Sequence, residues 1–222
     1  MTTIAMPTPH GDRPIKGLLA KWYAANTAEM MKEYVDLARR FAGELAPASS
    51  VLEVAPGPGY FSIELARLGS YQITGLDLSA TFVKMASQKA ADAGVNVKFI
   101  QGSASNMPLP KGSFDFLLCR AAFKNFADPV GALREMCRVL KPGGRALIID
   151  LKHEASPDEI DRALDQMKLS RFNRVMNKLI FRHFLLKTAY TRAQFEHMLG
   201  QTNCKRFEIV ESDLGFEISV TK

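Results

Sequence analysis

Two kinds of apolar spacing alternate along the middle of this chain. Short apolar runs, typical of buried strands, are separated by longer stretches whose apolar residues lie three or four apart, as on one face of a helix. The runs predict strands at 51–55, 71–79, 95–102, 113–120 and 145–151, and the spaced stretches predict helices at 60–69, 81–94 and 129–144. Strands and helices that alternate in this way are typical of βαβ units around a parallel sheet.

The two ends of the chain add flanking elements to this core. Residues 1–15 are rich in Pro, Thr and charge and are expected to form a loose arm, whereas residues 16–45 have the spacing of an amphipathic helix. At the other end, residues 206–212 and 216–222 alternate between apolar and polar positions. They predict two strands that form an antiparallel hairpin at the edge of the sheet.

A turn rich in proline and glycine, APGPG at 55–59, joins the first predicted strand to the next helix. Gly57 and Gly59 lack a Cβ, so a ligand can approach the backbone closely there. The helix that begins near Tyr60 points its free N–H groups at the same space. Because ligands of parallel sheets bind beyond the carboxyl ends of the strands, this turn is the first candidate for a binding site.

The turn by itself does not identify the ligand. The dinucleotide fingerprint GxGxxG needs a third glycine, and Ser62 occupies that position here. Asp77, at the end of the second predicted strand, suits the two hydroxyls of a ribose. This acid fits NAD and other adenosine ligands equally well, so the residues alone leave both open.

Composition narrows the class of protein. With 222 residues, 47% of them hydrophobic, the chain is expected to form one domain with a sizeable core. No run approaches the ~20 apolar residues that span a bilayer, and we see no secretory signal, so the expected setting is cytoplasmic. Three cysteines without a CxxC pair argue against a disulfide framework or a zinc site. Cys119, Cys137 and Cys204 are therefore expected to be free thiols, and no metal is expected.

The formal net charge of +6 is unevenly distributed. Residues 166–192 contain seven basic residues and no acid. They belong to a segment that begins with a helix capped by Ser156, with Pro157 in its first turn, and that is expected to cover the ligand site. One side of a helix in this segment carries Lys168, Arg171, Arg174, Lys178 and Arg182. Such a face is either an ordinary solvated surface or one that attracts an anionic substrate or an acidic membrane.

A series of short motifs gives the strongest functional signal. Glu53, the glycine turn and Asp77 in GLDLS are followed in order by QGSASNMPLP, FDFLLC and ALREMCRVLKPGGRALIID. Together, over about residues 50–150, they resemble the class I S-adenosylmethionine-dependent methyltransferases, specifically the small-molecule group called methyltransferase type 11. The segment AAFKNFADP, followed by RVLKPGG, is also similar to the quinone-biosynthesis C-methyltransferases.

This resemblance implies a fold and a division of the chain. The implied class is α/β, with a Rossmann-like seven-stranded sheet of order 3-2-1-4-5-7-6, mostly parallel with an antiparallel last strand, with helices on both faces and a helical cap. Residues 1–222 are expected to form a single methyltransferase domain. Its parts are an N-terminal arm and helix (1–46), a cofactor-binding core (47–155), a helical cap or substrate region (156–200) and closing strands (201–222).

The same resemblance implies the cofactor, S-adenosyl-L-methionine, with S-adenosyl-L-homocysteine as product. Asp77 holds the ribose in this interpretation, and the backbone of Cys119 and Arg120 holds the amine and carboxylate of the cofactor. The implied cofactor-binding residues are Glu53, Ala55, Gly57, Gly59, Asp77, Leu78, Ser103, Ala104, Cys119 and Arg120.

Two of these positions depart from the family pattern, and four features of the site have a structural alternative. The family usually has glycine where Ala55 stands, and alanine fits there if its φ is negative. It often has an acid where Ser103 stands, and serine hydrogen-bonds the adenine amine without charge assistance. The alternatives are that the glycine turn is only a tight turn and that Asp77 is an acid at a helix N-terminus. Likewise, Glu53 could cap a nearby helix, and Ser103 could only close a turn.

Residues that flank the core are the candidates for the acceptor site. The expected substrate-binding residues are Trp22, Tyr23, Phe123, Lys124, Asn125 and Tyr190. Methyl transfer needs an acceptor lone pair in line with the S–CH₃ bond, and a thiol, phenol or acidic carbon must also lose a proton. The catalytic candidates are His153, Tyr23 and Lys124. His153 could serve as the base, and Lys124 with Asn125 could fix a polar group of the acceptor. Ordinary packing or solvent exposure remains the alternative for each of these side chains.

Three classes of function are open from the sequence. The favoured one is a methyltransferase that acts on oxygen, sulfur, nitrogen or activated carbon of a small molecule. The basic charge suggests an RNA methyltransferase as an alternative, but the (D/N)PPY-type tetrapeptide of many base N-methyltransferases is absent where CRAAF follows the fourth strand, so nucleic acid is not expected as a partner. The third class is a non-catalytic cofactor-binding protein. Nothing in the sequence fixes the acceptor or the oligomeric state.

Overall fold

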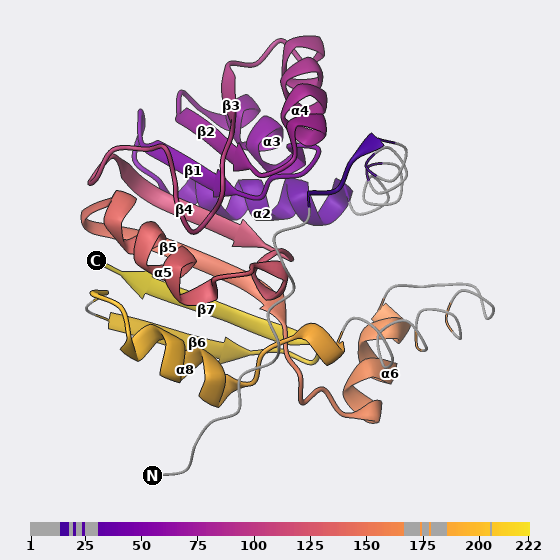
Figure 1. Cartoon of the computed structure of the whole chain (residues 1–222). Helices are drawn as coiled ribbons and strands as arrows, with labels where there is room; N and C mark the ends of the chain where they lie inside the picture. The colour runs from indigo at the N-terminus through magenta and orange to yellow at the C-terminus, as the bar shows by residue number, and fades with distance from the viewer. Residues whose placement is uncertain are drawn as a thin grey trace.

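The chain folds around one seven-stranded sheet, which contains all the strands that the sequence predicts (Figure 1). The computed structural model describes residues 14–17, 20, 24, 31–166, 174, 178, 186–204 and 206–222. The strand order is β3-β2-β1-β4-β5-β7-β6. The first five strands in this order pair in parallel, and β7 is antiparallel to both β5 and β6. The expected Rossmann-like order, with its antiparallel last strand, is therefore confirmed.

Helices and strands alternate through the core. The strands are β1 (Ser50–Val54), β2 (Gln72–Asp77), β3 (Val97–Gln101), β4 (Phe114–Arg120), β5 (Leu140–Leu151), β6 (Arg206–Glu211) and β7 (Gly215–Thr221). The helices are α2 (Met31–Glu44), α3 (Tyr60–Leu68), α4 (Ala80–Asp92), α5 (Pro129–Val139), α6 (Pro157–Gln166) and α8 (Arg192–Gly200), with short 3₁₀ turns η1 (Phe123–Asn125) and η3 (Leu186–Thr188).

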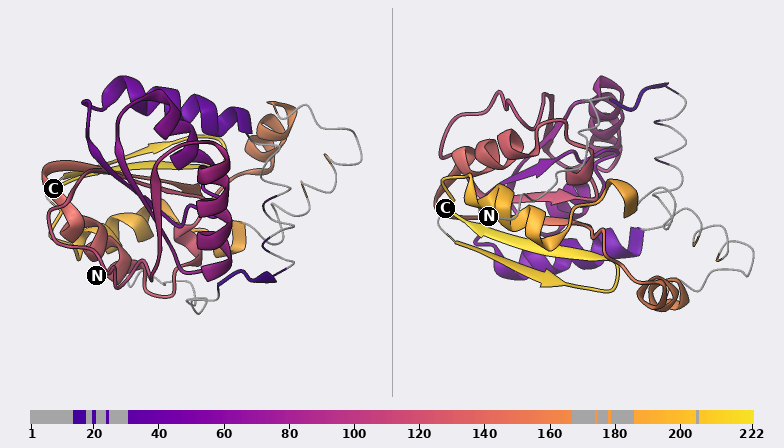
Figure 2. Two further views of the ribbon diagram at one scale, coloured as in Figure 1. Left: turned by 90° about the horizontal axis from the view of Figure 1, so that it is seen from above. Right: turned by 60° about the horizontal axis from the view of Figure 1, so that its bottom comes forward.

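Helices cover both faces of the sheet, so its central strands are buried on both sides (Figure 2). On β4, Phe116 and Leu118 pack with the helices α2 and α3, whereas Leu117 and Cys119 pack with α5 and α8 on the opposite face. Burial of successive residues on opposite faces explains why this strand reads as a continuous apolar run. The same two layers leave the carboxyl ends of the strands free to form a site.

One predicted boundary is wrong. The helix expected over 129–144 ends at Val139, and β5 begins at Leu140 with an extended backbone. Pro142 explains the early end, because proline has no N–H for the helix and disfavours helical geometry in the residue before it. The register of β4 on β5 shifts between Phe114 and Phe116 and accommodates the extra residues.

The predicted helix start at Ser156 and Pro157 is confirmed in α6. Ser156 Oγ accepts a hydrogen bond from Glu159 N, and the Glu159 carboxylate accepts one from Ser156 N. These reciprocal bonds form a capping box. Ile160 and Leu164 of α6 pack against Leu186, beyond the carboxyl ends of the strands (Figure 1). Among the helices of the described ranges, none is long and apolar enough to cross a membrane.

Two side chains of the expected basic face are visible, and both are paired. Arg174 Nη2 lies 2.8 Å from a carboxylate oxygen of Asp165, and Lys178 Nζ lies 2.6 Å from one of Asp161. Acids of α6 therefore neutralise these two cations. The other members of that face, Lys168, Arg171 and Arg182, lie outside the described residues.

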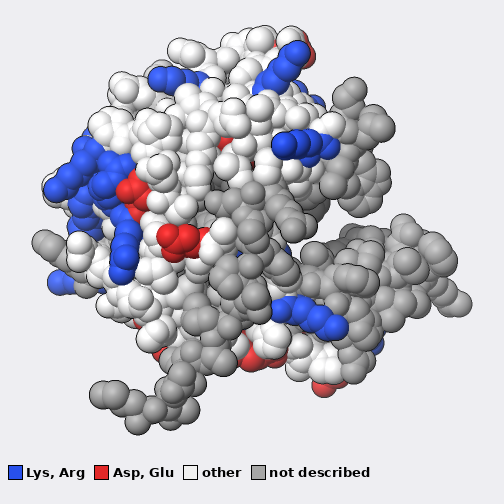
Figure 3. All heavy atoms as spheres, in the orientation of Figure 1, with Lys and Arg blue, Asp and Glu red and all other residues white. Residues whose placement is uncertain are grey.

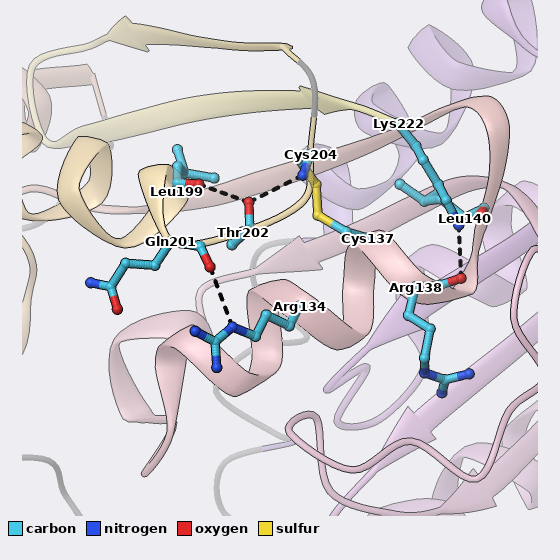
Figure 4. The surroundings of a disulfide bond; sticks show 9 residues. All are labelled: Arg134, Cys137, Arg138, Leu140, Leu199, Gln201, Thr202, Cys204 and Lys222. Atoms are coloured by element: carbon cyan, nitrogen blue, oxygen red, sulfur yellow. Dashed lines mark hydrogen bonds between the residues drawn. A yellow bond between two sulfur atoms is a disulfide. The ribbon is translucent and has the colours of Figure 1, made fainter.

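A disulfide contradicts the expectation of three free thiols (Figure 4). Cys137 on α5 is bonded to Cys204, which follows α8, with a Cα–Cα separation of 5.8 Å. The two residues are 67 positions apart, so their pairing depends on the packing of α5 beside α8. Cys119 is free and fully buried.

Candidate functional site

A cavity of about 1010 Å³ lies at the carboxyl ends of the parallel strands. The glycine turn after β1 and the end of β2 form one end, where Gly57 and Asp77 line it together. The segment after β4 and the turn between β6 and β7 form the other end. A volume at the upper limit of drug-sized pockets leaves room for two small ligands side by side.

A direct hydrogen bond joins the glycine turn to Asp77. Gly57 N donates to Asp77 Oδ2 at 3.0 Å, and Ser79 N donates to Oδ1 at 2.8 Å. The side chain of Ser79 in turn caps α4 by accepting from Phe82 N. Burial raises the pKa of Asp77, while the bonds from Ser79 and Gly57 oppose that change. Backbone donors therefore fix this carboxylate in the cavity wall.

The conformation of the turn explains its glycines and corrects one expectation. Gly59 has φ +79°, and a Cβ on it would lie 2.7 Å from Phe99 Cζ and 2.9 Å from Ala86 Cβ. Ala55 has φ +55°, in the left-handed region, so the expectation that alanine fits there through a negative φ is wrong. An L-residue in this region costs about 1–2 kcal/mol. The turn therefore keeps its shape in spite of local backbone strain.

Glu53 supports the turn from behind instead of lining the cavity. Its Oε2 accepts from both Ser62 N and Ser62 Oγ, in the first turn of α3. Because Gly59 has no side chain to cap this helix, Glu53 supplies the cap. This position matches the alternative that Glu53 caps a nearby helix. Burial raises the pKa of Glu53 to about 7, against the lowering effect of both Ser62 bonds.

Arg120, at the end of β4, contacts the first turn of α2 through Glu33. Its guanidinium pairs with the carboxylate of Glu33 and lies 4.6 Å from the ring centroid of Tyr34. Arg120 and Glu33 both line the cavity. The positive charge of Arg120 also favours the ionised form of the Glu53 carboxylate.

A buried ion pair forms the wall at the other end. Lys124 Nζ lies 3.1 Å from Asp150 Oδ1 and donates to Ala121 O at 3.2 Å, while Lys124 N donates to Asp150 Oδ2. The side chains of Lys124 and Asp150 are 8% and 1% exposed, and both residues line the cavity. An ammonium has three N–H donors, so one remains available to a ligand within the described structure.

The structure sorts the predicted site residues into three groups. Those that line the cavity are Ala55, Gly57, Asp77, Leu78, Ser103, Ala104, Arg120, Lys124 and Asn125. Those described but not lining it are Glu53, Gly59, Cys119, Phe123, His153 and Tyr190. Trp22 and Tyr23 lie outside the described residues.

The aromatic residues of the second group belong to the core. Phe123 is fully buried, with ring centroids 5.2 Å from Phe195 and 5.8 Å from Tyr190. These contacts match the packing alternative for Phe123 and Tyr190, not a direct contact with substrate. His153 is exposed and its Nδ1 is 2.9 Å from Leu186 O, so its position does not favour a role as general base in the cavity.

Ser103 lines the cavity but is also engaged in a local turn. Its Oγ accepts from Ser105 N at 3.3 Å and lies 3.0 Å from Ser105 Oγ. Both interpretations of this residue, the turn and the ligand contact, are thus compatible with its position.

Sequence reasoning missed the contribution of the closing hairpin. Val210, Leu214 and Phe216 line the cavity, at or near the turn between β6 and β7. That turn reaches the site because β7 pairs with β5, where a Cβ on Gly215 would lie 2.3 Å from Asp150 O. The alternating pattern predicted the hairpin, but no signal in it located the turn at the ligand site.

The site has little of the chain's excess positive charge. A group of Lys and Arg side chains gathers at the opposite side of the molecule, near α5 and the C-terminus (Figure 3). There, Lys111 and Arg138 lie close enough to Lys222 to lower its pKa, after the larger effect of burial. In contrast, the lining of the cavity includes the acids Glu33, Asp77, Asp150, Glu211 and Glu217 and the cations Arg120 and Lys124.

The residues at the β1–β2 end fit an adenosine ligand. The Asp77 carboxylate faces the cavity with two oxygens, each of which accepts one backbone bond and keeps a lone pair for a ribose hydroxyl. Leu78, Phe82 and Ala104 add apolar surface next to it, suited to the faces of a flat base. This combination agrees with the cofactor class that the sequence resemblance implies.

Comparison with known proteins agrees with this geometry. A family model described as a methyltransferase domain matches residues 52–148. Over these residues the chain is similar to a methyltransferase domain. The chain shares 36% identity over 160 residues with a demethylmenaquinone methyltransferase of Deinococcus radiodurans, covering 67% of the chain and 66% of that protein. It shares 35% identity over 134 residues with the ubiquinone/menaquinone biosynthesis C-methyltransferase UbiE of a Marinomonas species, covering 59% and 53%. The chain thus spans less than two thirds of either relative.

Solved structures share the fold of this chain. A protein from Methanococcus maripaludis superposes with a TM-score of 0.76 at 23% identity, over 95% of each chain. A SAM-dependent methyltransferase from Aquifex aeolicus gives a TM-score of 0.64 at 20% identity, over 83% of this chain and 88% of that one. At such low identity these likenesses concern the architecture alone.

Proposed function

We propose that this protein is an S-adenosylmethionine-dependent methyltransferase that acts on a small-molecule acceptor. The observation that carries the proposal is the shared cavity: Gly57 and Asp77 are hydrogen-bonded at one end, and Lys124 and Asn125 line the other. One ligand therefore fits next to the glycine turn while a second approaches it from the β5–β7 side. When bound, S-adenosylmethionine supplies a methyl group on a sulfonium, which is a reactive donor without further activation.

The cofactor would be held by residues of β1, β2 and β4 and the segments that follow them. Asp77 binds the ribose hydroxyls, and Leu78 and Ala104 contact the base. The backbone of the turn at Ala55 and Gly57, which both line the cavity, lies beside the methionyl part, because a glycine without a Cβ allows close approach. Ser103 offers a hydroxyl at the same end.

Lys124 keeps the role that the sequence suggested for it, which is to fix a polar group of the acceptor. Its Nζ is held between Asp150 and Ala121 O, in a geometry that suits a hydrogen-bond donor. Its free N–H donates to the acceptor and stabilises negative charge on an oxygen there. Asp150 fixes the direction of that donor through bonds to both the ammonium and the amide of Lys124.

The acceptor end favours a mostly apolar molecule with an ionisable oxygen. Phe126, Leu151, Val210, Leu214 and Phe216 line it, next to Lys124 and Asn125. A phenol or quinol combines the two features, and the names of the relatives in quinone biosynthesis point to the same class. We therefore place aromatic hydroxyl compounds first among acceptors, ahead of thiols and amines.

A turnover screen tests the proposed function. The purified protein is incubated with S-adenosylmethionine and panels of quinols, phenols, thiols and amines, and the release of S-adenosylhomocysteine is measured. We expect release only with particular acceptors and most of it with apolar hydroxyl compounds. Release that needs RNA instead would contradict the assignment of a small-molecule acceptor.

A further inference from the structure

The ion pair between Glu33 and Arg120 lies across the glycine turn from Asp77. In the sheet, β1 lies between β2 and β4, and Val54 of β1 pairs with Leu76 on one side and Cys119 on the other. Neighbouring strands are about 4.8 Å apart, so the end of β2 and the end of β4 are separated by about 10 Å. A ligand that extends from Asp77 over the turn reaches Arg120 at its other end.

Both members of this pair have unused hydrogen-bonding capacity toward the cavity. Arg120 uses Nη2 for Glu33, and a guanidinium has five N–H donors in total. Glu33 uses only Oε2 for that bond. No further hydrogen bond connects either side chain to the described part of the chain, yet both line the cavity.

Position and exposure make Arg120 the fixed member and Glu33 the adjustable one. The Arg120 side chain is 15% exposed and lies over the ring of Tyr34, which limits its movement. The Glu33 side chain is 53% exposed and stands in the first turn of α2. A fixed cation next to an adjustable anion is complementary to a group that carries both charges on neighbouring atoms.

We propose that Glu33 and Arg120 together bind the amino-acid end of the cofactor. The guanidinium of Arg120 binds the carboxylate, and the carboxylate of Glu33 binds the ammonium. Glu33 then makes the helix α2 part of the cofactor site and selects for a ligand with an intact amino-acid group. This inference rests on the proposed function, but it adds a residue that no motif of the sequence indicated.

Binding calorimetry with three ligands tests this inference. S-adenosylhomocysteine has both charges, its decarboxylated analogue keeps only the ammonium, and 5′-methylthioadenosine has neither. Variant Glu33→Gln is expected to bind the first two about three- to tenfold more weakly and the third within twofold of wild type, because a partly exposed charge pair contributes modestly. Arg120→Gln is expected to weaken S-adenosylhomocysteine by more than the decarboxylated analogue.

A control variant lies on the same helix. Glu44→Gln removes an acid of α2 that pairs with Arg40 and Arg145, outside the cavity, and is expected to bind all three ligands as wild type does. The inference is overturned if Glu33→Gln leaves S-adenosylhomocysteine binding unchanged, or weakens all three ligands equally. Failure of the proposed function itself looks different, because wild type then binds none of the three. The Glu33 variant alone decides the question if Arg120→Gln does not fold.

Discussion

The Gly57 amide and the Asp77 carboxylate are 3.0 Å apart, and this hydrogen bond connects the turn after β1 to the end of β2. It places the two most informative motifs of the sequence in one cavity wall. The turn excludes side chains from the space in front of it, and the carboxylate supplies the acceptors there. A ligand with a ribose and a longer substituent satisfies both features at once.

Replacement of Gly59 by alanine tests the packing of the turn. Its φ of +79° and the 2.7 Å approach of a Cβ to Phe99 predict strain and overpacking together. We expect Gly59→Ala to lower the free energy of unfolding by about 2–4 kcal/mol, measured by urea titration.

Gly94→Ala is the matched control for that variant. Gly94 has a similar φ of +67°, but its Cβ would meet nothing within 4 Å. It should lose only about 1 kcal/mol, from backbone strain alone. If both variants lose the same free energy of unfolding, the contact of the added Cβ with Phe99 does not contribute to the destabilisation.

Glu53 should make stability depend on pH near neutrality. Burial raises its folded-state pKa to about 7, above the ~4.3 of an unfolded chain, so the folded protein binds more protons between these values. The contribution of Glu53 to stability is therefore fully present below about pH 4 and is lost as the pH rises toward 7. Relative to Glu53→Gln, we expect wild type to lose on the order of 1–3 kcal/mol across this range, measured by thermal or urea unfolding. A constant difference between pH 5 and 8 would contradict the shifted pKa.

The disulfide predicts a specific thiol count. Unfolded protein without reductant should show one reactive thiol, Cys119, and reduction should raise the number to three. Because the bond closes a loop of 67 residues, its reduction is expected to cost about 2–4 kcal/mol of stability. Three thiols before reduction would contradict the pairing, and would suit a reducing cytoplasm in which such bonds are rare.

Lys124→Met separates a catalytic role from a role in cofactor binding. Loss of the ammonium removes the donor to the acceptor oxygen, so kcat should fall roughly 10- to 100-fold. Affinity for S-adenosylhomocysteine should stay within about twofold, although stability falls because Asp150 loses its buried partner. Lys84→Met, on the exposed side of α4, is the control and should keep wild-type kcat. An unchanged kcat in Lys124→Met would remove this residue from the mechanism.

The sequence predicted the sheet, and the meeting of Gly57 with Asp77 in one cavity, because local physics specifies them. Strands buried on both faces leave continuous apolar runs, and a turn with positive φ requires residues such as Gly57 and Gly59. The resemblance added the strand order, and the structure confirms it. Because the carboxyl ends of parallel strands lie at one edge of the sheet, the motif residues that follow these strands lie close together.

The other end of the cavity was predicted less well because it depends on contacts between distant segments. Phe123 and Tyr190 have the composition expected of a substrate pocket, but only the packing of η1 against α8 shows that they are core residues. The pairing of Cys137 with Cys204 likewise depends on the approach of α5 to α8. Helical spacing indicated neither which face would be buried nor which elements would become neighbours.

The most direct test of the central claim is calorimetric titration of S-adenosylhomocysteine into wild type, Asp77→Asn and the exposed control Asp92→Asn. We predict one binding site in wild type and in the control, and a loss of at least about tenfold in affinity in Asp77→Asn, since the amide cannot accept from both ribose hydroxyls. No binding to folded wild type, or equal affinity in all three proteins, would contradict the account.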